Sequence, residues 1–393
     1  MSLPETPVDT LRERLRRYGA GIAPRGRSEP ARPPRPSAGS GGGDGVEIVR
    51  ARYALGHRHG CVEIGASLGW VAEEHACAAA GMVWLDTETT GLAGGTGTYA
   101  FLVGLAYVDG GVLVTEQFLL RRLRSEAHLL GAVGERLASR PHLVTFNGLR
   151  FDWPILESRF ILARQRPASP EVHTDLITPA RRLWHRVFGT YRLSMLEAEV
   201  IGAPRHDDVP GWLIPGIYVE YLRSGDRTAL EPVIAHNRAD LLAMVALHGE
   251  VLRTLRDLEA ARVRFDWEGA GMLLVRRGEH DRAAQCFDRA VDEAAEPRDR
   301  WRALRRLSRM YRLTGAEAAR CRRLETEVAS WQAADLYRVH VLEEVAKLRT
   351  RARDLAAARG AAGEALEIAS RLGLAGPTVR LSKRLARLSD QMR

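Results

Sequence analysis

Two acidic residues, Asp86 and Glu88, stand one residue apart at the end of an apolar run. The stretch is MVWLDTETTGLAGGTGTYAFLVGLAYV, beginning at Met82. Residues two apart in a β-strand face the same side, so both carboxylates would point into one space. Carboxylate oxygens are the ligands that hard divalent cations prefer. A solvated turn at the end of a strand would carry the same pair, so this motif alone leaves both interpretations open.

Further carboxylates follow in two later segments. TFNGLRFDWPIL places Asp152 just past a short apolar strand, at the start of a helix. AHNRADLLAMVAL places His236 and Asp240 four residues apart, on one face of a helix. Taken singly, Asp152 is also explained as an acid favoured by the helix dipole, and the other two as a surface pair. Three segments that each carry a carboxylate beside an apolar run together favour one cation site.

The whole-chain composition bounds the class of protein. With 393 residues, 45% of them hydrophobic, the chain exceeds the usual length of one domain, and we expect two folded domains. No apolar run approaches the ~18 to 20 residues that cross a bilayer, and the first residues lack the apolar core of a secretory signal. We therefore expect a cytoplasmic protein with no membrane partner. The cysteines lie far apart, without a C-x-x-C, which predicts reduced thiols at Cys61, Cys77, Cys286 and Cys321.

The net charge of +9 permits a nucleic-acid partner. Nearly all the basic residues are arginine, with lysine only at Lys347 and Lys383, so a biased genome composition explains the charge equally well. From Glu250 onward there are 30 basic and 22 acidic residues, so the positive excess lies toward the C-terminus.

The order of predicted elements indicates the fold. Residues 1–45 are rich in Pro, Gly, Ser and Arg, which predicts a disordered tail. Residues 46–255 form the second unit, in which 46–80 predict an accessory hairpin and helix. The runs MVWLD, YAFLVGLAYV and VLVTEQFLL predict three antiparallel strands, and helices then alternate with short strands. This order predicts a ribonuclease-H-like α/β fold, a mixed sheet flanked by helices.

Residues 256–393 predict an all-α domain. GMLLVRRGEHDRAAQCFDRAV and RLSRMYRLTGAEAARCRRLETEV align at an offset of 37 residues, from Gly278 to Gly315. The pattern resembles tetratricopeptide repeats, although it is slightly longer than their usual 34 residues. AAARGAAGEALEIASRLG suggests a third unit. An irregular helical bundle would give similar spacing.

The three acidic motifs resemble those of the DEDD exonuclease superfamily. The first is D-x-E at Asp86 and Glu88, the second is N-x-x-x-F-D ending at Asp152, and the third runs from His236 to Asp240. Within that superfamily LDTETTGLAGGTGTYAFLVGLAY, HTDLITPARRLW and RHDDVPGW resemble the YprB-type bacterial predicted exonucleases, over about residues 46–255. In one departure, histidine takes the spacing at which relatives carry tyrosine. An imidazole is the better-matched base at neutral pH.

The resemblance implies a metal-dependent 3'-5' exonuclease that hydrolyses DNA or RNA with two divalent cations, Mg²⁺ or Mn²⁺, about 3.5 to 4 Å apart. Asp86 would bridge both ions. Glu88 and Asp240 would complete the ion at the attacking water, and Asp152 would hold the other. His236 would take the proton of the water. Substrate contacts are expected from Thr89, Thr90, Asn147, Arg150 and Arg238. The expected partner is single-stranded DNA or RNA, and the helical repeats would bind nucleic acid or a protein.

Several alternatives remain open. The chain is also consistent with a nucleic-acid or protein-binding adaptor that carries a vestigial nuclease domain, or with a structure-specific endonuclease of the same fold. GLAGGTGT either cradles a phosphate or forms a hairpin turn. RHDDVPGW either touches substrate or a metal, through His206, Asp207 or Asp208, or is a capped turn before Pro210. Arg150, Asp175 and Arg238 each either contact phosphate or form a surface salt bridge.

Overall fold

The computed structural model describes residues 37–39, 45–75, 79–91, 97–166 and 170–392. Most of the predicted tail, the centre of the GLAGGTGT loop and Cys77 lie outside the described residues. Of residues 1–45 the structure describes Gly45 and the short strand β1, Ser37–Gly39. Cys61, Cys286 and Cys321 are free thiols, as predicted.

A seven-stranded mixed sheet forms the centre of the first domain, in the order β1-β2-β7-β6-β5-β8-β9. The strands after β1 are β2 Val46–Tyr53, β5 Met82–Thr89, β6 Ala100–Asp109, β7 Val112–Leu120, β8 His142–Thr145 and β9 Val172–Asp175. Neighbouring strands from β1 to β5 are antiparallel, whereas β8 pairs parallel with both β5 and β9. The predicted antiparallel trio is confirmed as β5, β6 and β7.

The stretch expected to be an accessory hairpin is instead part of this sheet. β2 pairs with β7 along its whole length, from Val46 opposite Leu120 to Tyr53 opposite Leu113. Its alternating pattern buries Ala51 and Tyr53 in the core beneath the helices, which explains the pairing. The only separate hairpin among the described residues joins β3, Arg58–His59, to β4, Val62–Glu63. The helix expected at AEEHACAAA begins earlier, as α2, Ile64–His75.

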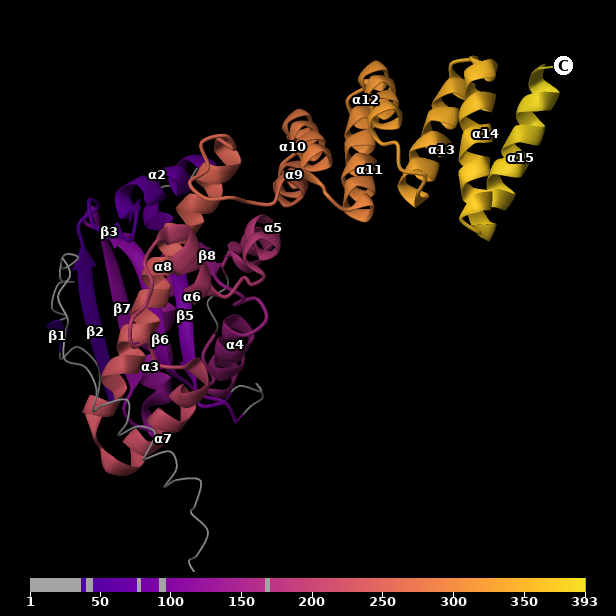
Figure 1. Ribbon diagram of the computed structural model, residues 1–393. Helices are drawn as coiled ribbons and strands as arrows, with labels where there is room; N and C mark the ends of the chain where they lie inside the picture. Colours follow the sequence, from indigo (N-terminus) through magenta and orange to yellow (C-terminus); the bar gives the residue numbers. More distant parts are fainter. Residues whose placement is uncertain (1–36, 40–44, 76–78, 92–96, 167–169, 393) are drawn as a thin grey trace, which may run out of the picture. The chain divides into compact units, whose positions relative to one another are not determined.

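Helices cover the sheet. They are α3 Glu126–Ala138, α4 Asp152–Leu162, α5 Ile177–Phe188, α6 Leu193–Leu196, the π-helix η3 Glu197–Ile201, α7 Ile214–Ser224 and α8 Glu231–Arg256, with short 3₁₀ turns η1 Ala79–Gly81, η2 Leu123–Ser125, η4 Gly211–Leu213 and η5 Arg227–Leu230. Figure 1 shows α8 crossing the sheet over β7, β6 and β5. Met82 and Trp84 of β5 pack against Leu241 and Val245 of α8. Because side chains alternate along a strand, the even-numbered residues that follow in β5 also face α8.

The rest of the chain is helical, as predicted. Its helices are α9 Trp267–Arg276, α10 His280–Glu293, α11 Pro297–Leu313, α12 Glu317–Ser330, α13 Leu336–Arg351, α14 Leu355–Arg371 and α15 Ala375–Met392. Gly278 and Gly315, which align in the 37-residue offset, both have positive φ, of 77° and 73°, in the turns after α9 and α11. Arg353 takes the same conformation after α13. The repeated turns fit the predicted helical-hairpin unit, and the likeness to tetratricopeptide repeats stays a prediction.

No helix in the described part of the chain combines the length and the apolar character that crossing a bilayer requires.

The close contact between Gly104 of the sheet and Asn237 of α8 predicts how a larger side chain at Gly104 would affect stability. Gly104 of β6 lies opposite Asp86 of β5, and a Cβ added there would lie 2.2 Å from the side-chain oxygen of buried Asn237. We expect Gly104→Ala to lower the free energy of unfolding by roughly 1 to 3 kcal/mol, because α8 must move or Asn237 must change rotamer. Urea denaturation measures the change. Gly69→Ala is the control, since Gly69 lies in α2 with open space around it and alanine favours helix. Wild-type stability in Gly104→Ala would show that this approach does not constrain the fold.

Candidate active site

Three elements bring the predicted acidic residues together. Asp86 and Glu88 lie on the face of β5 that α8 covers, Asp152 begins α4, and His236 and Asp240 lie one turn apart in α8. Ligand atoms of Glu88, His236 and Asp240 all lie within 4.8 Å of one another. The charges of Glu88, Asp152 and Asp240 all act on Asp86, so the five residues predicted from separate segments lie in one cluster.

Asp86 is held by an amide network that spans the sheet and α8. Asn237 Nδ2 donates to Asp86 Oδ2 at 2.7 Å, and Gln117 Nε2 of β7 donates to Asn237 Oδ1 at 2.7 Å. Gln117 thereby fixes which end of the amide faces the acid. The small Gly104 is what allows Asn237 to reach this place.

Asp152 is held by the strand that carries the first two acids. The backbone N–H and Oγ1 of Thr87 donate to Asp152 Oδ1, at 3.1 and 2.6 Å. Asp152 Oδ2 takes no part in these two bonds. The carboxylate is 9% exposed, and its hydrogen bonds tie α4 to β5.

His236 is oriented by an acid from the RHDDVPGW loop. Its Nδ1 lies 2.6 Å from Asp208 Oδ1, while its Nε2 lies 3.4 Å from Asp240 Oδ2 and 3.9 Å from Glu88 Oε1. Because an ionised carboxylate only accepts hydrogen bonds, we assign the proton to Nδ1, which leaves Nε2 facing the acids. Burial lowers the pKa of His236, but Asp208, Asp240 and Glu88 outweigh it, so the pKa lies above its ordinary value.

Arg205 links the same loop to the acidic cluster. Its guanidinium, 11% exposed, binds Asp240 Oδ1 and buried Glu197 directly, and its Nη1 lies 3.2 Å from Asp208 Oδ2. Glu197 lies in the π-helix η3 and also accepts from His59 Nε2 at 2.7 Å. Despite burial, these carboxylates raise the pKa of Arg205, which stays charged. Because Arg205 binds Oδ1 of Asp240, the other oxygen, Oδ2, remains available to face His236.

The remaining carboxylates repel one another. Burial, and then the charges of Asp240, Glu88 and Asp152, raise the pKa of Asp86 well above its usual range, although Asn237 opposes the shift. Burial and the neighbouring acids raise the pKa of Glu88 to about 8, against the opposing charge of His236. Burial also raises the pKa of Asp152 to about 6, although the hydrogen bonds from Thr87 oppose it. Four oxygen-donor side chains with too little positive charge beside them fit divalent cations.

Two of the predicted substrate contacts are engaged in the turn after β5. Thr89 Oγ1 donates to the carbonyl oxygen of Gly91 at 2.8 Å, and Thr90 Oγ1 accepts from the backbone N–H of Tyr99 at 3.0 Å. Both hydroxyls therefore stabilise the connection between β5 and β6.

The other predicted substrate contacts lie in two places. Asn147 is half-buried and has a φ of 68°. Its backbone N–H donates to Asp175 Oδ1 at 2.6 Å. Asp175 also accepts from the backbone N–H of Leu149 at 3.2 Å, so its carboxylate stabilises this loop. Arg150 is exposed on the same loop. Arg238 lies in α8, two residues after His236; burial raises the pKa of Tyr53 in β2, and the charge of Arg238 opposes that shift.

Four residues that support the site were not predicted as part of it: Thr87, Arg205, Asp208 and Asn237. Asp208 belongs to the RHDDVPGW motif, for which a contact with substrate or metal was left open, and Asn237 directly follows His236. The sequence could therefore have indicated both residues. Thr87 and Arg205 also lie within quoted motifs, but the sequence does not identify their partners, which lie 65 and 35 residues away along the chain.

The raised pKa values predict a pH-dependent stability without metal. The folded pKa of Asp86 and of Glu88 lies above the model-compound values of 3.8 and 4.5, so the folded protein holds protons that the unfolded chain releases. The cluster therefore lowers the free energy of unfolding little below about pH 4. It lowers that free energy progressively more as the pH rises toward the folded-state pKa values of Asp86 and Glu88. In EDTA we expect Asp86→Asn to raise the melting temperature more at about pH 8 than at about pH 5. Asp109→Asn, an exposed acid in β6, is the control. An equal shift at both pH values would contradict the repulsion.

The sequence of this chain is similar to sequences of known proteins. The family model described as RNase_H superfamily matches residues 83–252, which include all four clustered acids and His236. YprB of Bacillus subtilis (strain 168), an uncharacterized protein, is 30% identical over 299 residues, covering 72% of this chain and 70% of YprB. The ribonuclease-H-like fold class is thereby confirmed, and the superfamily indicates a nuclease-type function. The chain belongs to the YprB family and carries an RNase_H superfamily domain.

Proposed function

We propose that this protein is a metal-dependent 3'-5' exonuclease that hydrolyses phosphodiester bonds of DNA or RNA by a two-metal-ion mechanism. One observation carries the proposal: four carboxylates and His236 converge from β5, α4 and α8. The superfamily match supports a nuclease-type activity and a nucleic-acid substrate. The likeness to DEDD exonucleases adds the direction of digestion and the number of ions.

The proposed ligands of two Mg²⁺ or Mn²⁺ ions are Asp86, Glu88, Asp152 and Asp240. Carboxylate oxygens suit these hard cations better than zinc. When bound, the cations stabilise negative charge on the attacking and leaving oxygens of the phosphodiester. Asp86 is the proposed bridging ligand, because the charges of the three other acids all act on it.

His236 is the proposed general base. With its Nδ1 proton donated to Asp208, its Nε2 takes the proton of the attacking water. Asp208 then stabilises the imidazolium that forms. Arg205 holds Asp240 and Asp208 in one arrangement, so both helix and loop present fixed partners to the imidazole. A ligand role for His236 is the alternative, favoured by the closeness of its Nε2 to Glu88 and Asp240.

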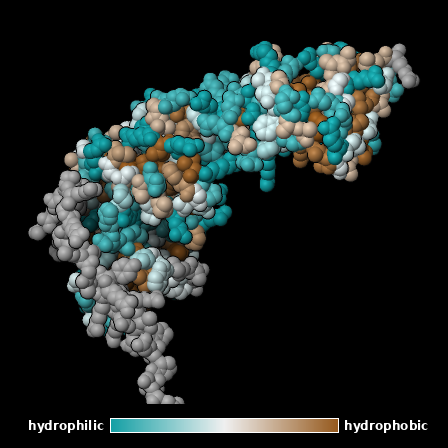
Figure 2. All heavy atoms as spheres, in the orientation of Figure 1, coloured by the Kyte–Doolittle hydropathy of each residue, from teal (hydrophilic) through white to brown (hydrophobic). Residues whose placement is uncertain are grey.

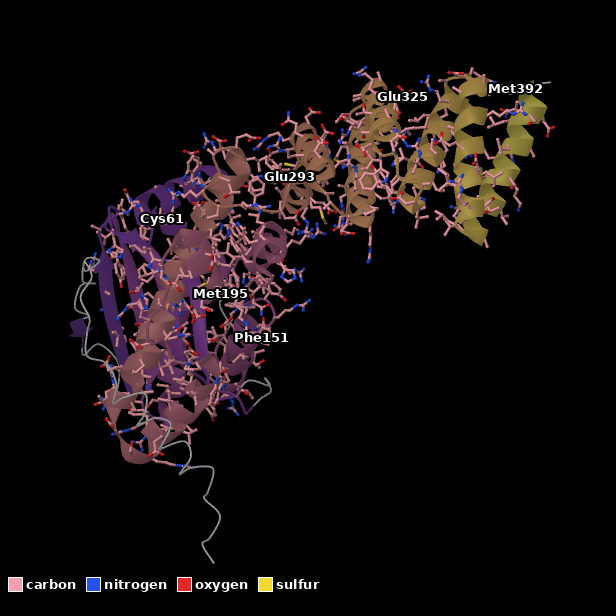
Figure 3. The ribbon with its side chains drawn as sticks, in the orientation of Figure 1. Cys61, Phe151, Met195, Glu293, Glu325 and Met392 are labelled. Atoms are coloured by element: carbon pink, nitrogen blue, oxygen red, sulfur yellow. The ribbon has the colours of Figure 1, made fainter. Side chains whose placement is uncertain are left out.

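Exposed apolar side chains beside the acids support a single-stranded substrate. Leu149 and Phe151 are each 52% exposed, in the loop that leads into Asp152. Phe151 is labelled in Figure 3, where it lies at the side of the sheet domain next to α4. Unpaired bases stack on such surfaces, whereas a duplex conceals its base faces. Arg150 lies between them and is the proposed phosphate contact.

Digestion of labelled nucleic acids tests the proposal. With Mg²⁺ or Mn²⁺ we expect release of mononucleotides from the 3' end of single-stranded DNA or RNA, and no release in EDTA. Asp86→Asn should abolish the activity, because it removes charge that both cations need, and Asp109→Asn should not. Binding without hydrolysis under every condition would instead support the adaptor with a vestigial nuclease domain. Cleavage of circular substrates would support an endonuclease, since a circle has no end.

The role of His236 is tested by substitution. We expect His236→Ala to lose about 10² to 10⁴ in turnover while Mn²⁺ binding largely survives, because a base contributes that much. His236→Tyr should recover part of the loss, since relatives carry tyrosine at this spacing. Asp208→Asn should lose less than His236→Ala, because the imidazole remains but its charged partner does not. Near-wild-type turnover in His236→Ala would remove His236 from the mechanism, and loss of Mn²⁺ binding would favour the ligand role.

A further inference from the structure

A pocket of about 680 Å³ lies among α5 and the helices from α9 to α13. Eight of its fifteen lining residues are arginines, and one, Glu344, is an acid. Apolar side chains, including Met272, Phe287 and Met310, complete the lining. We call this surface the arginine pocket.

Three of the eight arginines are neutralised by acids of the helical domain. Arg302 and Arg306 bind the buried carboxylate of Glu268, at 2.9 and 2.6 Å. Arg320 binds Glu344 at 2.9 Å. These arginines hold helices together, so part of the sequence's basic excess is structural.

The other five arginines form no ion pair with any carboxylate of the described residues: Arg182, Arg276, Arg305, Arg309 and Arg312. Arg182 shows the consequence most clearly. Its buried Nε lacks a hydrogen-bond partner within the described part of the chain, and its Nη1 lies 3.1 Å from the sulfur of Met272. Burial lowers the pKa of Arg182, and the charges of Arg276, Arg181 and Arg306 lower it further. The pocket thus holds more positive charge than its own acids balance.

Three of these arginines form a row on one helix. Arg305, Arg309 and Arg312 are exposed on α11, at i, i+4 and i+7, which places them on one face. Successive members are roughly 6 and 4.5 Å apart along the helix axis, at about 1.5 Å per residue. In Figure 2 hydrophilic residues cover most of the visible surface over α9 to α12. A row of cations about one turn apart suits a linear polyanion better than a single small anion.

The lining favours a phosphate backbone over an acidic peptide. Guanidinium groups donate hydrogen bonds and accept none, and phosphate oxygens only accept them. A peptide presents backbone N–H donors as well. Asn and Gln, which pair with both backbone groups, do not occur among the residues that line the pocket.

We propose that the arginine pocket binds the phosphate backbone of the nucleic acid, so that the helical domain holds the strand on which the acidic cluster acts. The inference rests on the proposed function and extends it to the helical domain. The proposal also assigns part of the excess positive charge of the C-terminal region to one binding site.

Binding in EDTA tests the pocket separately from catalysis. The probe is fluorescently labelled oligothymidylate, titrated with the full chain at several salt concentrations. We expect the triple variant Arg305→Gln, Arg309→Gln, Arg312→Gln to bind roughly tenfold or more weakly, with a salt exponent lower by about 2, because three single-strand phosphate contacts are lost. The matched control replaces exposed arginines outside the pocket, Arg322→Gln, Arg359→Gln and Arg387→Gln, and removes the same charge. It should bind nearly as wild type.

Four outcomes would contradict the proposed role of the arginine pocket. Equal weakening in both triple variants would mean a diffuse positive field. Unchanged binding in the pocket variant, or no binding by the wild type, would place the nucleic acid elsewhere. Pocket-dependent binding of polyglutamate without binding of oligothymidylate would identify an acidic protein partner. Pocket-dependent binding without hydrolysis in Mg²⁺ would support the pocket and reject the exonuclease, so the two failures are distinguishable.

Discussion

Mutual repulsion among four carboxylates is the constraint on which the rest of this site depends. Asp86 and Glu88 sit at the end of a central strand, where the buried core of β5 prevents them from separating. Asp152 and Asp240 are fixed opposite by hydrogen bonds and an ion pair. The fold therefore supplies the energy that holds like charges together, and cations relieve the repulsion. In the proposed metal site, bound divalent cations would offset this destabilisation.

The same constraint explains why positive charge is arranged around the cluster and not within it. Arg205 neutralises one oxygen of Asp240 and one of Asp208, but the oxygens facing His236 stay free of it. A negative cluster also repels a polyanionic substrate. A chain that acts on nucleic acid then needs positive surface elsewhere, and the unpaired arginines of the proposed arginine pocket would supply it.

The clustering of four of the proposed site residues could be predicted from the sequence, because a strand and a helix impose fixed side-chain directions. Two-residue spacing in β5 places Asp86 and Glu88 on one face of the strand, and four-residue spacing in α8 places His236 and Asp240 on one face of the helix. Both pairs could therefore be predicted from the sequence. The pairing of β2 with β7 was missed, since strand alternation gives a face but not a partner. Thr87 and Arg205 were missed for the same reason: their roles depend on contacts between distant segments. The ion pairs that separate structural from unpaired arginines are likewise invisible in the sequence.

The most direct test of the clustered carboxylates is calorimetric titration with Mn²⁺ in buffers of different ionisation enthalpy near pH 7. The pKa of Glu88 is raised to about 8, and that of Asp86 stands well above its usual range, so the metal-free site holds protons at neutral pH. Cations bind the ionised carboxylates, and protons must leave as they enter. We predict Mn²⁺ binding accompanied by proton release, seen as an apparent enthalpy that changes with the buffer. Absence of binding, or binding with no buffer dependence, would contradict a repulsive carboxylate cluster that awaits divalent cations.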